Sequence, residues 1–433
     1  MTDLSERYRN SAYYLEKALT LIPTGAQTFS KSKYSLPEKV SPLFLKSGKG
    51  CIVQDVDNNN YIDFVSGLLA ISLGYQDPDV DDAVKAQLAQ GVSFSLSTLL
   101  EQELAELLVQ LIPCAEQVRF AKNGSDVTSA AIRLARAYTG KEHIASCGYH
   151  GWQDWYIGST SRDMGVPESV KSLTHTFEYN NLASLEALFD TYPHKLAAVI
   201  LEPITFVQPE HDFLHKVKSL CEKNGTVLIF DEMITGFRFG NGGAQEKFGV
   251  TPDLATFGKG MANGFPLSAI VGSKDIMSLM DDIFFSGTFG GEALSIAASI
   301  ATIKKIVEQD VCHKNYIKGQ SLKNKVSALI FEQHLGDIFD IQGDPAWTLL
   351  NVKSKGQYSA LQLKSLFLQE CYRNGVLITG THNLSFAHKP EDIEALISVY
   401  RESMLQVQRV CEENDMSHYF QGEFLKPIFK VRQ

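Results

Sequence analysis

The 433-residue chain lacks the features that mark several classes of protein. No stretch approaches the ~20 consecutive apolar residues of a membrane span. The first residues, MTDLSERYRNSAYY, are polar and charged, unlike a secretory signal. With a net charge of -10, the chain has no excess of basic residues of the kind that nucleic-acid binders carry. We therefore expect a cytoplasmic protein with small-molecule ligands, and neither nucleic acid nor membrane as a partner.

Cysteine is sparse as well, with seven scattered residues and no CxxC pair. An odd count without paired spacing argues against a disulfide framework and against a zinc cage, so we expect no bound metal. Hydrophobic residues make up 44% of the chain and charged residues 21%, which is ordinary for a globular protein. The length favours two or three structural units.

From about residue 80, short apolar runs alternate with segments of helical spacing. The expected strands are 118–121, 143–147, 196–201 and 226–230, and the clearest expected helices are 125–138 and 214–223. Such alternation predicts an α/β fold with a mainly parallel sheet covered by helices. Near-continuous apolar strands fit a sheet that is buried on both faces.

After about residue 310 the pattern changes, which predicts a smaller C-terminal α/β domain. Its expected helices are 320–333, 358–374 and 389–412, and its expected strands are 338–343 and 347–352.

Ligands of open α/β sheets bind beyond the carboxyl ends of the strands, so the residues after each apolar run are the first candidates. Asn123, Gly124 and Ser125 follow the run 118–121 and lead into a helix. A Gly-Ser turn at a helix N-terminus offers backbone N–H groups and a hydroxyl to a phosphate. The alternative is a plain N-cap by Ser125.

Two further runs end in residues that suit a flat, nitrogen-containing ring. Tyr149, flanked by Gly148 and Gly151, is placed to stack on such a ring, although this loop taken alone favours an aromatic side chain packed on the core. Asp231 directly follows a buried strand and needs a partner such as a protonated pyridine nitrogen. The alternative is a carboxylate that caps the next turn. Glu202 is a similar but weaker case.

Lys259 lies between two glycines in the sequence Phe257-Gly258-Lys259-Gly260, with apolar residues on both flanks. A lysine in a partly dry pocket loses its proton more easily and becomes a Schiff-base nucleophile. An exposed loop lysine is the alternative. Taken together, the four sites supply a phosphate cradle, a stacking ring, an acid for a ring nitrogen and an amine.

With these residues, the chain resembles the class III (ω-type) aminotransferases, and among them the glutamate-1-semialdehyde aminomutase-like branch. The resemblance covers roughly residues 15–405, nearly the whole chain. Its most specific stretch is FDEMITGFRFG…FGVTPDLATFGKGMANGFPLSAIVG, residues 230–272. It implies pyridoxal 5'-phosphate (PLP) as cofactor, with the pyridoxamine form arising during the cycle.

The resemblance also implies roles for individual residues. Lys259 would hold PLP as a Schiff base and then shuttle protons, and Asp231 would bind the pyridine nitrogen. Met233, where the family often has valine, would press on the ring face opposite Tyr149. Thr288 resembles the threonine that reaches the phosphate from the neighbouring subunit, which implies a homodimer with shared active sites.

Asn123, Gly124 and Ser125 would hold the phosphate, although this chain has Asn-Gly-Ser-Asp where the family usually has Ser-Gly-Thr-Glu. The change is conservative, because an amide and a hydroxyl still bind phosphate oxygens. The implied architecture is the PLP-dependent transferase fold type I. It divides the chain into an N-terminal segment, 1–65, that packs with the small domain, a large PLP-binding domain, 66–310, and the small domain, 311–433.

Two departures from the aminomutase pattern concern the substrate. Residues 27–33 lack the arginine that binds the substrate carboxylate in the aminomutase, and 380–385 replace an acidic loop. Uncharged polar groups favour a hydroxyl-rich substrate such as an oxo-sugar or sugar acid, which suggests polysaccharide biosynthesis. The candidate substrate-binding residues are Ser30, Lys31, His150, Glu202, His382 and Asn383.

These features predict an aminotransferase that moves an amino group from a donor such as L-glutamate to a carbonyl acceptor. An intramolecular 2,1-aminomutase is the first alternative, because it uses the same groups on one substrate. Racemisation or decarboxylation with PLP, and a non-catalytic protein that kept the fold, are the others.

Overall fold

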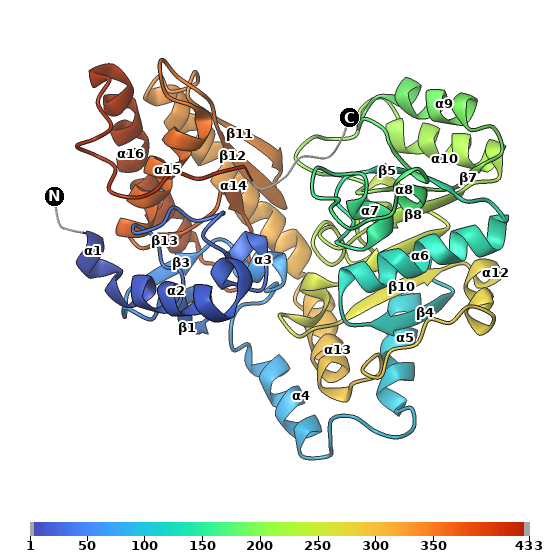
Figure 1. The fold of residues 1–433 in the computed structure, drawn as a ribbon. Coiled ribbons are helices and arrows are strands. Elements are labelled where there is room, and N and C mark those ends of the chain that lie inside the picture. Colours follow the sequence, from blue (N-terminus) through green and yellow to red (C-terminus); the bar gives the residue numbers. More distant parts are fainter. Residues whose placement is uncertain (1–3, 428–433) are drawn as a thin grey trace. The chain divides into compact units, whose positions relative to one another are not determined.

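The computed structural model describes residues 4–427, which fall into two compact units (Figure 1). The first unit contains 4–68, 73–77 and 314–427, and the second contains 69–72 and 78–313. Residues 1–3 and 428–433, which the expected N-terminal segment and small domain include, lie outside the described residues. No helix within 4–427 is long and apolar enough to cross a membrane.

The second unit is built on a seven-stranded sheet in the order β4-β10-β9-β8-β7-β5-β6. All neighbouring strands run parallel except β10, which is antiparallel to both β4 and β9. The strands are β4 (Gln117–Ala121), β5 (His143–Cys147), β6 (Thr174–Thr176), β7 (Leu196–Leu201), β8 (Val227–Asp231), β9 (Leu254–Phe257) and β10 (Ser268–Gly272).

The centre of this sheet is dry. Every residue of β7, β8, β9 and β10 is buried, as expected for strands covered by helices on both faces. The helical segments of this unit are α4 (Pro78–Leu88), α5 (Leu99–Leu111), α6 (Gly124–Thr139), α7 (Asp154–Ile157), α8 (Glu168–Lys171), α9 (Leu182–Thr191), α10 (Phe213–Asn224), α11 (Ala244–Phe248), η3 (Lys259–Ala262), α12 (Lys274–Met277), η4 (Ser278–Asp281) and α13 (Ala293–Glu308). Val127, Ala131 and Leu134 of α6 belong to the core cluster that also contains Ile200 and Ile229 of the sheet.

The first unit has two smaller sheets, β1-β2-β3-β13 and β11-β12-β14. β13 pairs with β3 in parallel, so residues near the two chain ends share one sheet. Its elements are α1 (Leu4–Arg7), α2 (Arg9–Leu21), η1 (Pro23–Gly25), η2 (Phe29–Lys31), β1 (Leu45–Lys49), β2 (Ile52–Asp55), β3 (Asn60–Asp63), β11 (Phe339–Asp344), β12 (Trp347–Val352), α15 (Ala360–Arg373), β13 (Val376–Leu377), β14 (Thr381–His382) and α16 (Pro390–Glu413). The short turn α3 (Ser66–Leu69) and the long helix α14 (Val311–Glu332) each have residues in both units.

The expected α/β class with a mainly parallel sheet is confirmed, and so are most of its elements. The strands expected over 143–147, 196–201 and 347–352 have those bounds. The strand expected over 226–230 ends one residue later, so Asp231 is its last residue rather than the first of a turn. β10 was not predicted, because a five-residue run between glycine-rich turns carries little periodicity.

Truncating a central strand residue tests the importance of this dry sheet. Ile229 of β8 is fully buried, and Ile229→Ala is expected to lower the free energy of unfolding by about 2–5 kcal/mol. Urea denaturation followed by circular dichroism measures it. Leu88→Ala is the control, since that side chain is 57% exposed. A loss for Ile229→Ala no larger than for the control would contradict the packing described.

Candidate active site

The sheet topology brings the candidate residues to one edge. β10 is antiparallel to both of its neighbours, so β4 runs in the same direction as β9 and the other parallel strands. The carboxyl ends of six strands therefore share an edge. Gly124, Gly148, Glu202, Asp231 and Lys259 lie at or just beyond those ends.

Asp231 is a buried carboxylate at the end of β8, and its residue is 3% exposed. Oδ2 lies 2.8 Å from His150 Nδ1. Oδ1 accepts hydrogen bonds from the Met233 amide at 3.1 Å and from Thr256 Oγ1 at 3.4 Å. These contacts fix the orientation of the carboxylate, since each of its oxygens has a partner. Each oxygen also keeps lone-pair capacity for a hydrogen bond from a ligand.

His150 was expected to contact substrate, and the structure gives it other partners. Its side chain is 0% exposed. Nδ1 bonds Asp231, and Nε2 lies 3.1 Å from the Cys147 carbonyl oxygen. With both ring nitrogens occupied, the geometry fits a group that orients Asp231, in place of the substrate contact we expected.

Lys259 stands in a conformation that lysine rarely adopts. It follows β9 and has a φ of 45°, in the left-handed region. Burial lowers the pKa of its amine, while the nearby carboxylates of Glu202 and Asp231 act in the opposite direction. An amine that is easily deprotonated and held beside two acids is suited to Schiff-base chemistry.

Glu202 lies directly after β7 and close to the same amine. Its Oε2 accepts a hydrogen bond from the Tyr149 amide at 3.0 Å. Burial raises the pKa of this carboxyl, and the Asp231 charge adds to the effect. Gly148, with a φ of 108°, makes room for it, because a Cβ there would lie 2.5 Å from Glu202 Oε2.

The N-terminus of α6 is arranged as an anion site. Asn123 is the N-cap, and its amide donates to Asp126 Oδ2 at 2.8 Å. Ser125 is not the cap: its Oγ accepts the Trp152 amide at 3.1 Å, which leaves its hydroxyl proton available. A Cβ on Gly151 would lie 2.2 Å from Ser125 Oγ, so this contact requires glycine.

Tyr149 and Met233 are the two residues expected to enclose a ring. Tyr149 is 51% exposed and lies edge-on to Tyr156, with ring centroids 5.6 Å apart. Met233 Sδ would be 2.9 Å from a Cβ on either Gly124 or Gly258. The Met233 thioether therefore lies between the turn at Gly124 and the turn that carries Lys259.

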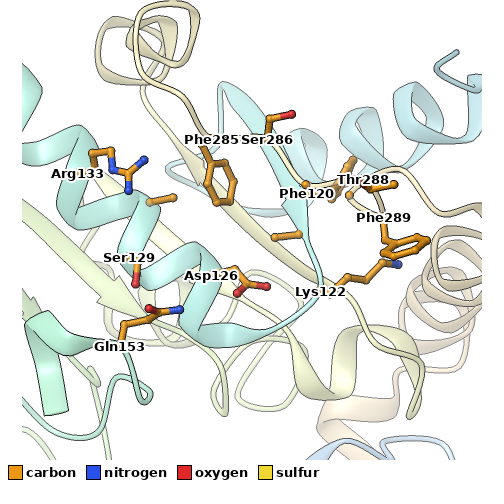
Figure 2. Close-up of a pocket in the computed structure, with 14 residues that line it drawn as sticks. Phe120, Lys122, Asp126, Ser129, Arg133, Gln153, Phe285, Ser286, Thr288 and Phe289 are labelled. Atoms are coloured by element: carbon orange, nitrogen blue, oxygen red, sulfur yellow. The ribbon is translucent and has the colours of Figure 1, made fainter. Parts of the chain in front are cut away.

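Thr288 lies in the segment between η4 and α13, and Ser125 lies in the first turn of α6. Figure 2 shows Thr288 lining a pocket of about 400 Å³ together with Asp126, Ser129 and Arg133 of α6. Gln153, which follows the Trp152 whose amide bonds Ser125 Oγ, lines the same pocket.

The remaining substrate candidates belong to the first unit. Ser30 and Lys31 are exposed. The His382 ring nitrogens lie 2.9 Å from Thr348 Oγ1 and 2.9 Å from Tyr400 OH. Asn383 accepts from Trp347 Nε1 and donates to the Val65 carbonyl. His382 and Asn383 are thus buried and hydrogen-bonded within their own unit, and they serve its packing.

The sequence did not reveal two contacts of Asp231. One is with the Thr256 hydroxyl, and the other is with the ring of His150, in the loop after β5. Thr256 is fully buried, inside an apolar strand, and its hydroxyl reaches Asp231. A lone threonine in such a strand was the available signal. The His150–Asp231 contact joins residues 81 positions apart, and no local pattern reveals it.

This edge fits PLP. A helix N-terminus with a free hydroxyl suits the phosphate, and a buried carboxylate suits the ring nitrogen. A half-exposed tyrosine suits the ring face, and an amine whose pKa is lowered suits the aldehyde.

Comparisons with known proteins agree with this geometry. Residues 34–390 match the family model described as Aminotransferase class-III. The chain is 34% identical to the 3-aminobutyryl-CoA aminotransferase of Cloacimonas acidaminovorans, over 91% of this chain and 96% of that one. It is also 34% identical to the glutamate-1-semialdehyde 2,1-aminomutase of Francisella philomiragia, over 90% and 96%. The structure of the Sphingopyxis FumI protein with PLP superposes with a TM-score of 0.86 at 27% identity, covering 93% of this chain and 97% of that one.

The lowered pKa of Lys259 makes a prediction about the protein without cofactor. Below 10.5, the ordinary pKa, the unfolded chain binds more protons than the folded one. The free energy of unfolding therefore rises with pH from the lowered pKa up to 10.5. Lys259→Met removes this penalty, so the variant should be more stable than the wild type at neutral pH, with a gap that shrinks toward pH 10.5.

Chemical denaturation across that pH range measures the effect. Lys216→Met, at an exposed lysine on α10, is the matched control and should show no such trend. Equal stability of Lys259→Met and wild type at every pH would show that this amine is not held in a desolvated site.

Proposed function

Because the chain belongs to the class III aminotransferase family, whose cofactor is PLP, we propose that it transfers an amino group between two separate substrates, from a donor such as L-glutamate to a carbonyl acceptor. The observation that carries this proposal is the placement of Lys259 beside the buried Asp231. One supplies an amine that loses its proton readily, and the other supplies a fixed negative charge.

When bound, PLP supplies an electron sink that makes the proton on the substrate carbon acidic. The protein's residues do the rest. Asp231, oriented by His150 and Thr256, would keep the ring nitrogen protonated. The Lys259 amine would take the proton from the substrate carbon and deliver it to the cofactor. Ser125 and the N-terminus of α6 would hold the phosphate.

An intramolecular 2,1-aminomutase is the second candidate, and the Francisella relative of that name favours it. Both reactions need the same residues around the cofactor. They differ in whether a separate amino donor is consumed. The absence of the carboxylate-binding arginine from residues 27–33 favours the transaminase.

For the acceptor, our hypothesis of an oxo-sugar or sugar acid rests on the exposed polar residues Ser30 and Lys31. His382 and Asn383 add little to it, since their hydrogen bonds are made within their own unit. A panel of carbonyl acceptors should therefore include sugars beside glutamate-1-semialdehyde and the ketone counterpart of 3-aminobutyryl-CoA, the substrates that the two relatives' names suggest.

We also propose a homodimer in which Thr288 serves the partner's phosphate site. Several large apolar side chains of the second unit are strongly exposed: Phe94, Leu96, Leu99, Phe284 and Phe289 are each at least 50% accessible. The Ala293 amide donates to the Val92 carbonyl, which joins the two loops that carry them. A second copy would cover this surface.

The first prediction concerns the amino donor. Purified holoenzyme should show a visible absorbance band that L-glutamate converts to the band of the pyridoxamine form, because the donor leaves its amino group on the cofactor. A spectrophotometric titration measures this. The Lys259→Ala variant, which lacks the amine, should not complete the conversion at a catalytic rate. A visible band that glutamate leaves unchanged, while glutamate-1-semialdehyde is isomerised without a donor, would favour the aminomutase.

The second prediction concerns the shared site. Lys259→Ala and Thr288→Ala should each be impaired alone, since each lesion affects both sites of a dimer. After the two variants are unfolded together and refolded, mixed dimers contain one site with neither lesion, so about a quarter of all sites should be intact. Activity assays before and after mixing measure the recovery. Absence of recovery from dimers shown to have exchanged subunits would place Thr288 in its own subunit's site.

A further inference from the structure

One segment of the chain, residues 66–77, leaves the first unit and returns to it. Its central residues, 69–72, belong to the second unit. We call 66–77 the strap. It begins with four consecutive residues of positive φ, between 47° and 71°, three of which are not glycine. Side chains are crowded in that region, so the start of the strap is strained and must be held by its surroundings.

Both flanks of the strap are anchored within the first unit. Ser66 Oγ donates to the Asn383 carbonyl at 2.6 Å. The Ala387 amide donates to the Leu73 carbonyl at 2.9 Å. Residues on both sides of 69–72 are thus hydrogen-bonded within the first unit.

The centre of the strap packs on the turn that carries Lys259. Ser72 Oγ donates to the Gly260 carbonyl at 2.8 Å, and Ser72 is 4% exposed. Ile71 lies so close that a Cβ on Gly264 would be 2.6 Å from its Cδ1. Because the Gly260 carbonyl is in a buried setting, losing its donor leaves an acceptor without a partner.

The turn needs such support. Lys259 and Asn263 both have positive φ, at 45° and 43°. A second buried hydroxyl, from Ser299 of α13, donates to the Met261 carbonyl at 3.1 Å. Two serines from separate segments thus bond successive carbonyl oxygens directly after Lys259.

We propose that Ser72 is a positioning residue for Lys259: its hydroxyl fastens the strained turn to the strap and so fixes the amine at the sheet edge. The catalytic consequence rests on the proposed role of Lys259 in aminotransfer. The structural consequence does not, since the hydrogen bond acts on the turn whether or not cofactor is present.

Hydrogen exchange of the full-length protein without cofactor tests this directly. Ser72→Ala should speed exchange in peptides covering 258–265 about five- to tenfold, as expected for loss of one buried hydrogen bond. Ser299→Ala should act on the same peptides. Ser72→Thr keeps the hydroxyl and should restore slow exchange.

Thr302→Val is the matched control. Thr302 is a buried residue of α13 whose hydroxyl bonds the Ala298 carbonyl of its own helix rather than a carbonyl of the turn. It should lower the melting temperature without a selective change in 258–265. A second readout is the pH profile of Lys259 modification by trinitrobenzenesulfonate in the cofactor-free protein. Its midpoint should move upward in Ser72→Ala, because a loosened turn admits water to the amine.

If Ser72→Ala lowers the melting temperature but leaves both the exchange of 258–265 and the labelling midpoint at wild-type values, the proposal is overturned and Ser72 only contributes to packing. If Ser72→Ala does not fold, Ser72→Cys, with a weaker donor, decides by the same two readouts. Neither readout requires turnover, so failure of the proposed aminotransfer would leave this result intact.

Discussion

The buried carboxylate of Asp231 is the group on which the arrangement of the site depends. An ionised acid at the end of a dry strand is strongly disfavoured unless hydrogen bonds and a positive charge compensate it. His150 and the Met233 amide provide part of that compensation. In the proposed holoenzyme, the ring nitrogen of PLP would supply the rest, so that cofactor binding would also relieve the buried charge. The loop after β5 carries His150, whose ring contacts Asp231 at the end of β8.

Lys259 meets the opposite requirement. Its amine has to be dry enough to lose a proton, yet close enough to acids to be stable when it carries one. Burial lowers its pKa, and Glu202 and Asp231 limit the effect. Such a balance depends on position, which explains why the turn is strained and why buried serines hold it. Strain of this kind persists only where the surrounding structure enforces it.

Much of this could be predicted from the sequence. The central strands were recognisable because β7 and β8 are continuous apolar runs, and the residues after them include Glu202 and Asp231. The phosphate turn was visible as Gly124-Ser125 before a helix. The hydrogen bond that Ser125 Oγ accepts from the Trp152 amide was not, because the two residues lie 27 positions apart. His382 and Asn383 were expected to bind substrate because residues 380–385 replace the acidic loop of the aminomutase with uncharged polar groups. In the structure their partners are Tyr400 and Trp347.

The measurement that tests the central claim most directly is the location of the cofactor's covalent bond. Reduction of the holoenzyme with borohydride, followed by proteolysis and mass spectrometry, fixes the cofactor to the lysine that holds it. The account predicts a pyridoxyl group on Lys259 alone, and reduced affinity for PLP when Asp231 is replaced by Asn. A pyridoxyl group on another lysine, such as Lys122 at the end of β4, would contradict the assignment of the site.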